Sequence, residues 1–186
     1  MDTQIITNPS EQELNMLASA LRNGELVSIP TETVYGLGAN GLDPEAMDKI
    51  YAAKGRPSDN PLILHVPNSE SIKPLVTEVS NTAQLLMDTF WPGPLTITLP
   101  KSDLVPDRAT GGLPHVALRC PDHKVCRALL ERAGVPVAAP SANISGRPSP
   151  TTAQDVYHDM KGRISYILDA GPCTIGVEST VVEVHD

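Results

Sequence analysis

The segment K-G-R-P-S-D-N-P holds the densest group of side chains in this sequence that could bind a phosphate. Lys54, Arg56, Ser58 and Asn60 lie close together, and the glycine and proline between them prevent a continuous helix. Two cations beside short polar donors on a stiff loop suit a polyanion. The segment therefore predicts a contact with the phosphates of a nucleotide.

Lys54 has a second interpretation, which its position alone does not exclude. Met47, Ile50 and Tyr51 recur on one stripe of an expected helix, and Lys54 is the next residue on that stripe. A lysine there must extend its ammonium to water, pair with an anion or face a cleft. Its cationic and polar neighbours favour the cleft.

Two further polar segments each follow an apolar strand. P-T-E-T-V-Y-G begins at Pro30, at the end of the strand expected over 25–30. A-P-S-A-N-I-S-G-R-P-S-P begins at Ala139, at the end of the strand expected over 135–139. Ligands of open α/β sheets bind beyond strand ends, so both segments are candidate binding loops. An ordinary turn and a surface loop are the alternatives.

Gly36, Gly38 and Gly41 match the G-x-G-x-x-G pattern of dinucleotide-binding proteins, but their context does not. That motif requires a strand directly before it and a helix that begins within it. Here Glu32 to Tyr35 intervene between the strand and the motif, and the next helix is expected only after Asp43. We therefore expect an irregular glycine-rich segment and no dinucleotide site.

Arg119 and His65 lie within apolar strands, where a buried polar side chain needs a hydrogen-bonding or ionic partner. Arg119 ends the expected strand 115–119 and could bind a carboxylate or phosphate, or pair with nearby Asp122. A lone histidine such as His65 is more often structural than a ligand. The histidines lack metal-site spacing, so we expect no protein metal site. No G-x-S-x-G motif supports a serine hydrolase.

Helices and strands must alternate to position these residues. Helix signals begin at Ser10, Asp43, Asp122 and Thr151 or Thr152, and amphipathic spacing marks another helix near 83–90. Strands are expected over 25–30, 62–66, 95–99, 115–119, 135–139, 165–169 and 179–184. This order predicts an α/β fold: one twisted, open sheet of mixed parallel and antiparallel strands with flanking helices.

Composition limits the functional class. The 186 residues fit one domain, and a net charge of −8 gives no general attraction to nucleic acid or membrane. One Phe, one Trp and four Tyr are too few for a row of base-stacking rings. Three cysteines without C-x-x-C suit a reducing compartment, and no signal peptide or membrane-length apolar run occurs. We expect a cytoplasmic enzyme.

Together these segments resemble the YrdC-domain family of threonylcarbamoyl-AMP synthases, over nearly the whole chain and in family order. The matching pieces are P-T-E-T-V-Y-G-L-G from Pro30, K-G-R-P-S-D-N-P-L from Lys54, F-W-P-G-P-L-T from Phe90, A-L-R-C-P-D-H from Ala117, A-P-S-A-N-I-S-G-R-P-S-P-T from Ala139 and G-V-E-S-T-V-V from Gly176.

The resemblance implies a reaction of L-threonine, bicarbonate and ATP that gives threonylcarbamoyl-AMP and pyrophosphate. The product would supply the threonylcarbamoyl group to the machinery that modifies an adenosine of tRNA. Magnesium would arrive on the ATP, since the sequence offers no obvious carboxylate cage. Any contact with tRNA is expected to be weak, because the net charge is −8.

The resemblance also assigns residues to the two substrates. Lys54 and Arg56 would do the catalytic work of neutralising charge on the phosphates. The expected ATP-binding residues are Lys54, Arg56, Asn60, His115, Ser141, Asn143 and Ser149. The expected threonine-binding residues are Thr33, His65, Arg119, Ala139 through its backbone, and Ser179.

The family pattern usually continues beyond the last strand to a segment that closes on the nucleotide. We therefore expect residues 1–186 to be a single YrdC-like domain that lacks this closing segment or a second domain. Two other functions remain open. One is a domain that handles carbamoyl-adenylate made from carbamoyl phosphate, and the other is a non-catalytic module that binds structured RNA.

Overall fold

The computed structural model describes residues 1–55 and 59–185, so Arg56 and Ser58 of the K-G-R-P-S-D-N-P segment lie outside the described residues. The strands of the described ranges are β1 (Gln4–Thr7), β2 (Val27–Ile29), β3 (Gly36–Asn40), β4 (Ile63–His65), β5 (Leu95–Pro100), β6 (His115–Arg119), β7 (Val137–Ala138), β8 (Tyr166–Asp169) and β9 (Thr180–Glu183). The helices there are α1 (Glu11–Arg22), α2 (Pro44–Lys54), α3 (Asn81–Phe90), α4 (Asp107–Thr110), α5 (Lys124–Ala133) and α6 (Ala153–Met160), with a 3₁₀ helix η1 (Ser69–Leu75).

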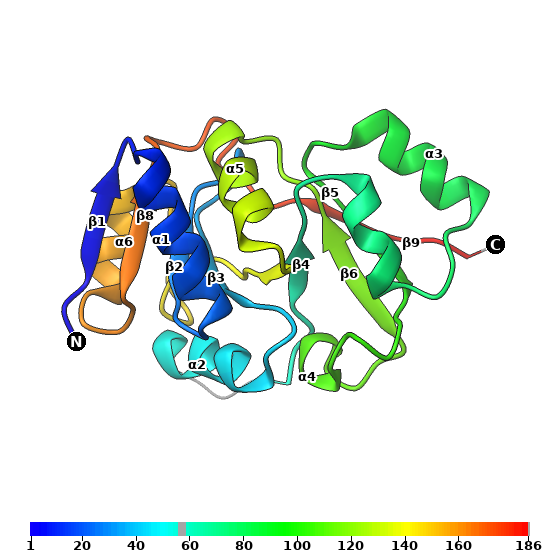
Figure 1. The fold of residues 1–186 in the computed structure, drawn as a ribbon, viewed down its shortest axis with the longest axis horizontal. Coiled ribbons are helices and arrows are strands. Elements are labelled where there is room, and N and C mark those ends of the chain that lie inside the picture. Colours follow the sequence, from blue (N-terminus) through cyan, green and yellow to red (C-terminus); the bar gives the residue numbers. More distant parts are fainter. Residues whose placement is uncertain (56–58, 186) are drawn as a thin grey trace.

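Within the described ranges, the strands join into one sheet in the order β1-β8-β2-β3-β7-β4-β6-β5-β9. Four pairs are parallel (β1–β8, β2–β8, β4–β6 and β5–β9) and four are antiparallel (β2–β3, β3–β7, β4–β7 and β5–β6). Figure 1 shows the sheet edge-to-edge across the molecule, with β1 near one end and β9 near the other. The predicted open, mixed α/β sheet with flanking helices is confirmed.

Local sequence signals set most of the helix ends. The Ser10 hydroxyl accepts from the Glu13 N–H at 3.1 Å, and the Glu13 carboxylate accepts from the Ser10 N–H at 3.0 Å. Asp43 caps the start of α2, and Gly55, with a φ of 81°, caps its end after Lys54. These two helix starts are confirmed.

The cap predicted at Asp122 is wrong. α5 begins one residue later, because the His123 ring accepts the Cys126 N–H at 3.2 Å. Histidine is not among the preferred capping residues, so the sequence favoured the aspartate beside it. The Asp122 N–H instead donates to Glu32.

The glycine-rich segment is a strand, which corrects the prediction of irregular structure. β3 contains Gly36 and Gly38 and pairs with both β2 and β7. A Cβ on Gly38 would lie 2.6 Å from the Val27 carbonyl oxygen and 3.1 Å from the Val137 side chain. Close approach of neighbouring groups therefore explains the glycine, and no helix begins within the motif as a dinucleotide site requires.

The two faces of the sheet are covered unequally. α1 and α5 pack together over one face, where Leu17 and Leu129 meet Ile29 and Val137 in one apolar cluster. α2, α3 and α6 contribute to the larger cluster on the opposite face, which includes Leu37, Leu64 and Leu118. None of the helices within the described ranges has both the length and the apolar character to cross a membrane.

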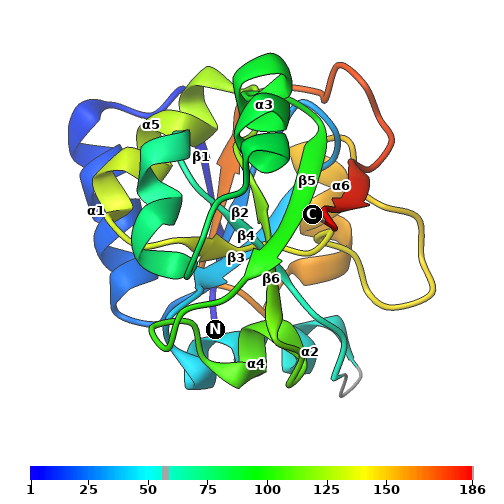
Figure 2. The same cartoon turned by 90° about the vertical axis from the view of Figure 1, so that its right-hand side faces the viewer.

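The face that α1 and α5 cover continues past β7 onto β4, β6, β5 and β9, where it stays open. By strand register, Ile63, Ala117 and Thr98 lie side by side on this part, and each is only half-buried. Figure 2 shows the same region from one side, with β9 beside β5 and the 140–149 loop beside α6. The open face carries one part of the candidate site, and the end of α2 with the 140–149 loop carries the other.

Candidate functional site

Lys54 is the last residue of α2, and its side chain ends against the 140–149 loop. Its ammonium donates to the carbonyl oxygens of Ser141 at 2.5 Å and Asn143 at 3.0 Å. In return, the Ser145 N–H donates to the Lys54 carbonyl oxygen at 3.0 Å. The half-buried ammonium thus lies in a cleft between two polar segments that the sequence singled out separately.

That cleft is a pocket of about 300 Å³, which we call the Lys54 pocket. Lys54, Asn60, Ser141 and Asn143 line it, and four predicted nucleotide-binding residues therefore meet at one place. Arg56, the other predicted catalytic residue, lies outside the described residues.

Asn143 is oriented by its own loop. Its amide nitrogen donates to the carbonyl oxygens of Ile144 at 3.1 Å and Arg147 at 2.9 Å. Among the described residues, its buried Oδ1 has no hydrogen-bond partner. Two carbonyl acceptors fix which way the amide points, so the group left for a ligand is an acceptor.

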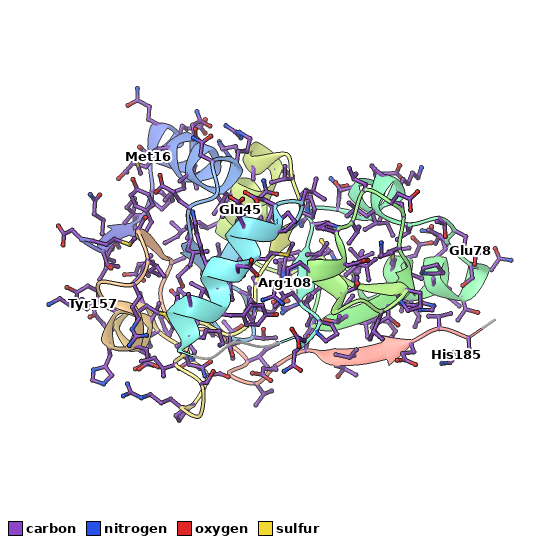
Figure 3. The ribbon with its side chains drawn as sticks, turned by 90° about the horizontal axis from the view of Figure 1, so that it is seen from below. Met16, Glu45, Glu78, Arg108, Tyr157 and His185 are labelled. Atoms are coloured by element: carbon purple, nitrogen blue, oxygen red, sulfur yellow. The ribbon has the colours of Figure 1, made fainter. Side chains whose placement is uncertain are left out.

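The far side of the Lys54 pocket is held by contacts from α2 and α4. The Tyr51 hydroxyl donates to the Asn60 carbonyl oxygen at 2.7 Å. Arg108 lies over the Tyr51 ring at 4.6 Å and pairs with Asp48 at 2.5 Å. Figure 3 shows Arg108 beside α2. These contacts fix the chain on both sides of residues 56–58.

A second polar group surrounds Arg119 at the end of β6. Its guanidinium pairs with the Glu32 carboxylate and donates to the Thr33 hydroxyl at 3.0 Å and the Gly93 carbonyl oxygen at 3.3 Å. Arg119 and Glu32 are both buried, at 4% and 6% exposed. Burial lowers the pKa of Arg119, and the Glu32 carboxylate opposes that shift.

The residue that pairs with Arg119 is Glu32, which was not predicted as a site residue. The alternative prediction, that Arg119 pairs with Asp122, is wrong. One Glu32 oxygen faces Arg119, and the other accepts the Asp122 N–H at 2.7 Å. The backbone carbonyl of Glu32 also accepts from Ile175 at 2.9 Å. The available signal was an acidic residue flanked by two threonines, shortly after a buried strand.

The strand register brings His65, Thr96 and Ser179 to the same place. His65 pairs with Arg119 across the parallel β4–β6 ladder, and the Thr96 and Ser179 hydroxyls lie 2.8 Å apart. The residues Thr33, His65, Thr96, Arg119 and Ser179 are called the Arg119 site below. It contains four of the five predicted threonine-binding residues.

His65 is 3% exposed, and its surroundings disfavour a charge. Burial, together with the positive charge of Arg119, lowers the pKa of His65 to about 3. The Ile63 carbonyl oxygen lies 3.1 Å from Nδ1 and can accept from it only if that nitrogen carries the hydrogen. His65 is therefore a neutral, hydrogen-bonding group at neutral pH.

Burial of neutral His65 predicts a loss of stability in acid. In the unfolded chain, His65 binds a proton below about pH 6.5, whereas in the folded chain it stays neutral down to about pH 3. Between these two pH values the unfolded chain binds more protons, so lowering the pH favours unfolding. We expect His65→Gln to reduce the slope of unfolding free energy against pH by about 1.4 kcal/mol per pH unit near pH 4.5. Urea titrations from pH 4 to 7 measure the slope, with the exposed His158→Gln as control. Equal slopes in both variants would contradict the assignment.

The remaining predicted residues lie around these two groups. Ala139 is buried next to β4, where its N–H donates to the Ile63 carbonyl oxygen at 3.2 Å. His115 is exposed at the start of β6, in the lining of a mostly apolar pocket of about 480 Å³ with Ile63, Thr98, Ala117 and Val181. This apolar pocket lies two residues along the strands from the Arg119 site, a separation of roughly 7 Å.

The segment between β8 and β9 closes one side of the open face. The N–H groups of Ile175 and Gly176 donate to the carbonyl oxygens of Glu32 and Thr33, each at 2.9 Å. Further on, the Ser149 hydroxyl donates to the Glu178 carboxylate at 2.8 Å. Ser149 therefore lies beside the segment between β8 and β9 and does not line the Lys54 pocket.

Comparison with known proteins accounts for this arrangement. The Sua5/YciO/YrdC family model, whose description reads "telomere recombination", matches residues 19–186. The chain belongs to this family. The predicted family resemblance is confirmed.

Two curated relatives in this family are named threonylcarbamoyl-AMP synthase. The protein of Pyrococcus abyssi (strain GE5 / Orsay) is 52% identical over 176 residues, which covers 95% of this chain and 52% of the relative. That of Bacillus subtilis (strain 168) is 51% identical over 178 residues, covering 95% of this chain and 51% of the relative. This chain therefore spans about half the length of both relatives.

A solved structure of the family has the same fold. Pyrococcus abyssi Sua5 complexed with L-threonine matches with a TM-score of 0.94 and 48% identity, covering 100% of this chain and 55% of that chain. At this similarity, the elements that carry the Lys54 pocket and the Arg119 site correspond between the two proteins.

Proposed function

We propose that this chain is a threonylcarbamoyl-AMP synthase, which joins L-threonine, bicarbonate and ATP to give L-threonylcarbamoyladenylate and pyrophosphate. The observation that carries the proposal is the presence of two chemically complementary sites, the Arg119 site and the Lys54 pocket, in one domain. One contains a buried guanidinium that can bind a carboxylate, and the other contains the Lys54 ammonium, held at the end of α2 against the polar 140–149 loop. The names of the two synthase relatives and the L-threonine complex of Sua5 support it.

The Arg119 site is proposed to bind L-threonine. A planar guanidinium matches a carboxylate in a two-point contact, and burial strengthens that contact by excluding water. The Thr33 and Ser179 hydroxyls and neutral His65 offer partners for the remaining polar groups of threonine. Ala139 would contribute through its backbone.

The Lys54 pocket and its surroundings are proposed to bind ATP. Lys54 and Arg56 would neutralise the phosphates, with Asn60, Ser141 and Ser149 as polar contacts. The unpaired Oδ1 of Asn143 needs a donor, so it suits a hydroxyl or amino group of the nucleotide rather than a phosphate oxygen. The apolar pocket beside His115 suits the adenine ring.

The proposed chemistry needs no protein nucleophile. The threonine amine and bicarbonate form a carbamate with loss of water, and a carbamate oxygen then attacks the α-phosphorus. The bond between the α-phosphorus and the bridging oxygen breaks, and pyrophosphate leaves. The protein would contribute orientation of the two substrates and stabilisation of the developing charge.

Magnesium is proposed to arrive as part of the Mg–ATP substrate. Within the described ranges, no group of three or more His, Cys, Asp or Glu side chains could hold a metal ion. Phosphate oxygens and water suit magnesium, which keeps much of its hydration in such sites.

The wider role is also a proposal. We place the chain in the cytoplasm, where it would pass its product to the machinery that modifies tRNA. A net charge of −8 limits any direct tRNA contact to a weak one. We further propose that residues 1–186 act as one YrdC-like domain together with a closing segment or second domain, which the greater length of the relatives supports.

A substrate-omission assay tests the function. Pyrophosphate release is expected only when ATP, L-threonine and bicarbonate are all present, because the attacking group is made from two of them. Release that continues without threonine would overturn the proposal. Carbamoyl phosphate in place of bicarbonate and threonine is the control, and turnover with it would instead indicate a carbamoyl-transfer domain.

A further inference from the structure

Asp159 is a buried carboxylate that accepts hydrogen bonds from the 140–149 loop. It lies on α6 and is 8% exposed. One of its oxygens accepts the Ile144 N–H at 2.9 Å, and the other accepts from the Arg147 guanidinium at 2.9 Å. Burial alone would raise the pKa of Asp159, but these two contacts outweigh it and leave that pKa below its ordinary value.

The loop that Asp159 holds is the one that fixes the Lys54 ammonium. Ile144 directly follows Asn143, whose carbonyl oxygen accepts from Lys54 at 3.0 Å. The Asn143 side chain then ties Ile144 to Arg147 through their carbonyl oxygens. A shift of this loop would therefore move both carbonyl groups that hold the Lys54 ammonium.

α6 itself does not depend on Asp159 for its place in the fold. Val156 and Met160 are fully buried in the larger apolar cluster and hold the helix against the sheet. Thr152 caps the start of the helix, accepting the Asp155 N–H at 3.1 Å. The Asp159 contacts thus act on the loop rather than on the helix that carries them.

We propose that Asp159 is a positioning residue for the nucleotide, which holds the 140–149 loop and, through it, the Lys54 ammonium in the arrangement that binds ATP. This inference rests on the proposed function. It predicts that Asp159 affects ATP and leaves threonine untouched, because among the described residues the Asp159 carboxylate bonds to Ile144 and Arg147 and to no residue of the Arg119 site.

Asp159→Asn is the first test, because it keeps an acceptor for Ile144 and removes only the charge that pairs with Arg147. We expect the Kd for ATP to rise about tenfold and the Kd for L-threonine to stay within twofold, both by calorimetry. The matched control is Asp155→Asn, an exposed aspartate of the same helix, which should leave both constants unchanged. Unchanged ATP binding in Asp159→Asn would refute the inference.

Hydrogen exchange separates positioning from a general loss of stability. Asp159→Asn is expected to speed amide exchange in the 140–149 loop while α6 and β8 keep their protection. Equal acceleration in all three would show a merely structural role and overturn the inference.

Arg147→Gln provides a second variant that leaves α6 unchanged, in case Asp159→Asn fails to fold. Arg147 is half-exposed, and its loss should reproduce the ATP-specific weakening. A wild-type Kd for ATP in this variant would count against the inference. A wild-type chain that binds no ATP would instead overturn the proposed function, and the inference with it.

Discussion

Replacing Lys54 by methionine is expected to lower kcat/KM for ATP by about two to three orders of magnitude. Methionine keeps the length and apolar stem of the side chain but removes the ammonium that lies in the Lys54 pocket. A preorganised positive charge acts most strongly where charge develops, which in the proposed reaction is on the phosphates. Steady-state pyrophosphate release measures the loss.

Lys49→Met is the matched control for this variant. Lys49 lies on the same helix and also donates to a backbone carbonyl, that of Gly24 at 2.8 Å. Its removal should cost similar stability and leave kcat/KM within about twofold. If Lys54→Met retained wild-type activity, Lys54 would only tie α2 to the 140–149 loop.

The helices were predictable because their signals are local. The capping box at Ser10 and the Asp43-Pro44 start act within one turn of helix, so residues a few positions apart contain the information. Apolar runs likewise indicated most of the strands. The short β1, η1 and α4 lacked such patterns and were missed.

β3 could not be predicted, because its glycines are required by close contacts with residues that are distant in the sequence. Gly38 is required by the Val27 carbonyl and the Val137 side chain, and Val137 lies almost 100 residues away. Local propensity predicted an irregular segment, since glycine is unfavourable in strands. The order of strands in the sheet determines these neighbours, and it cannot be predicted from the sequence of any single segment.

In the candidate site, too, local features were predictable and contacts between distant residues were not. Residue types identified Lys54, Arg119 and the polar loops as separate candidates, and the family resemblance assigned them to substrates. The pairing of Arg119 with Glu32, 87 residues apart, depends on how β2 and β6 are brought together by the fold. Asp159 escaped notice for the same reason, because an aspartate on a helix is ordinary until its partners are known.

Replacing Glu32 by glutamine is expected to reduce the free energy of unfolding by about 3–5 kcal/mol and to impair use of L-threonine. Glutamine can still accept the Asp122 N–H, but it leaves the buried Arg119 guanidinium without a counter-charge. Urea denaturation measures the first effect. The exposed pair of Glu70 and Lys73 supplies the control, since Glu70→Gln should cost at most about 1 kcal/mol.

A double variant separates the stabilising role of this ion pair from its proposed binding role. Replacing Glu32 by leucine and Arg119 by methionine removes both charges, and a buried pair exchanged for apolar side chains often loses little stability. The double variant should therefore be more stable than Glu32→Gln and yet release no pyrophosphate in response to threonine. If it remained active with threonine, the Arg119 guanidinium would be a structural group, and the carboxylate of threonine would have to bind elsewhere.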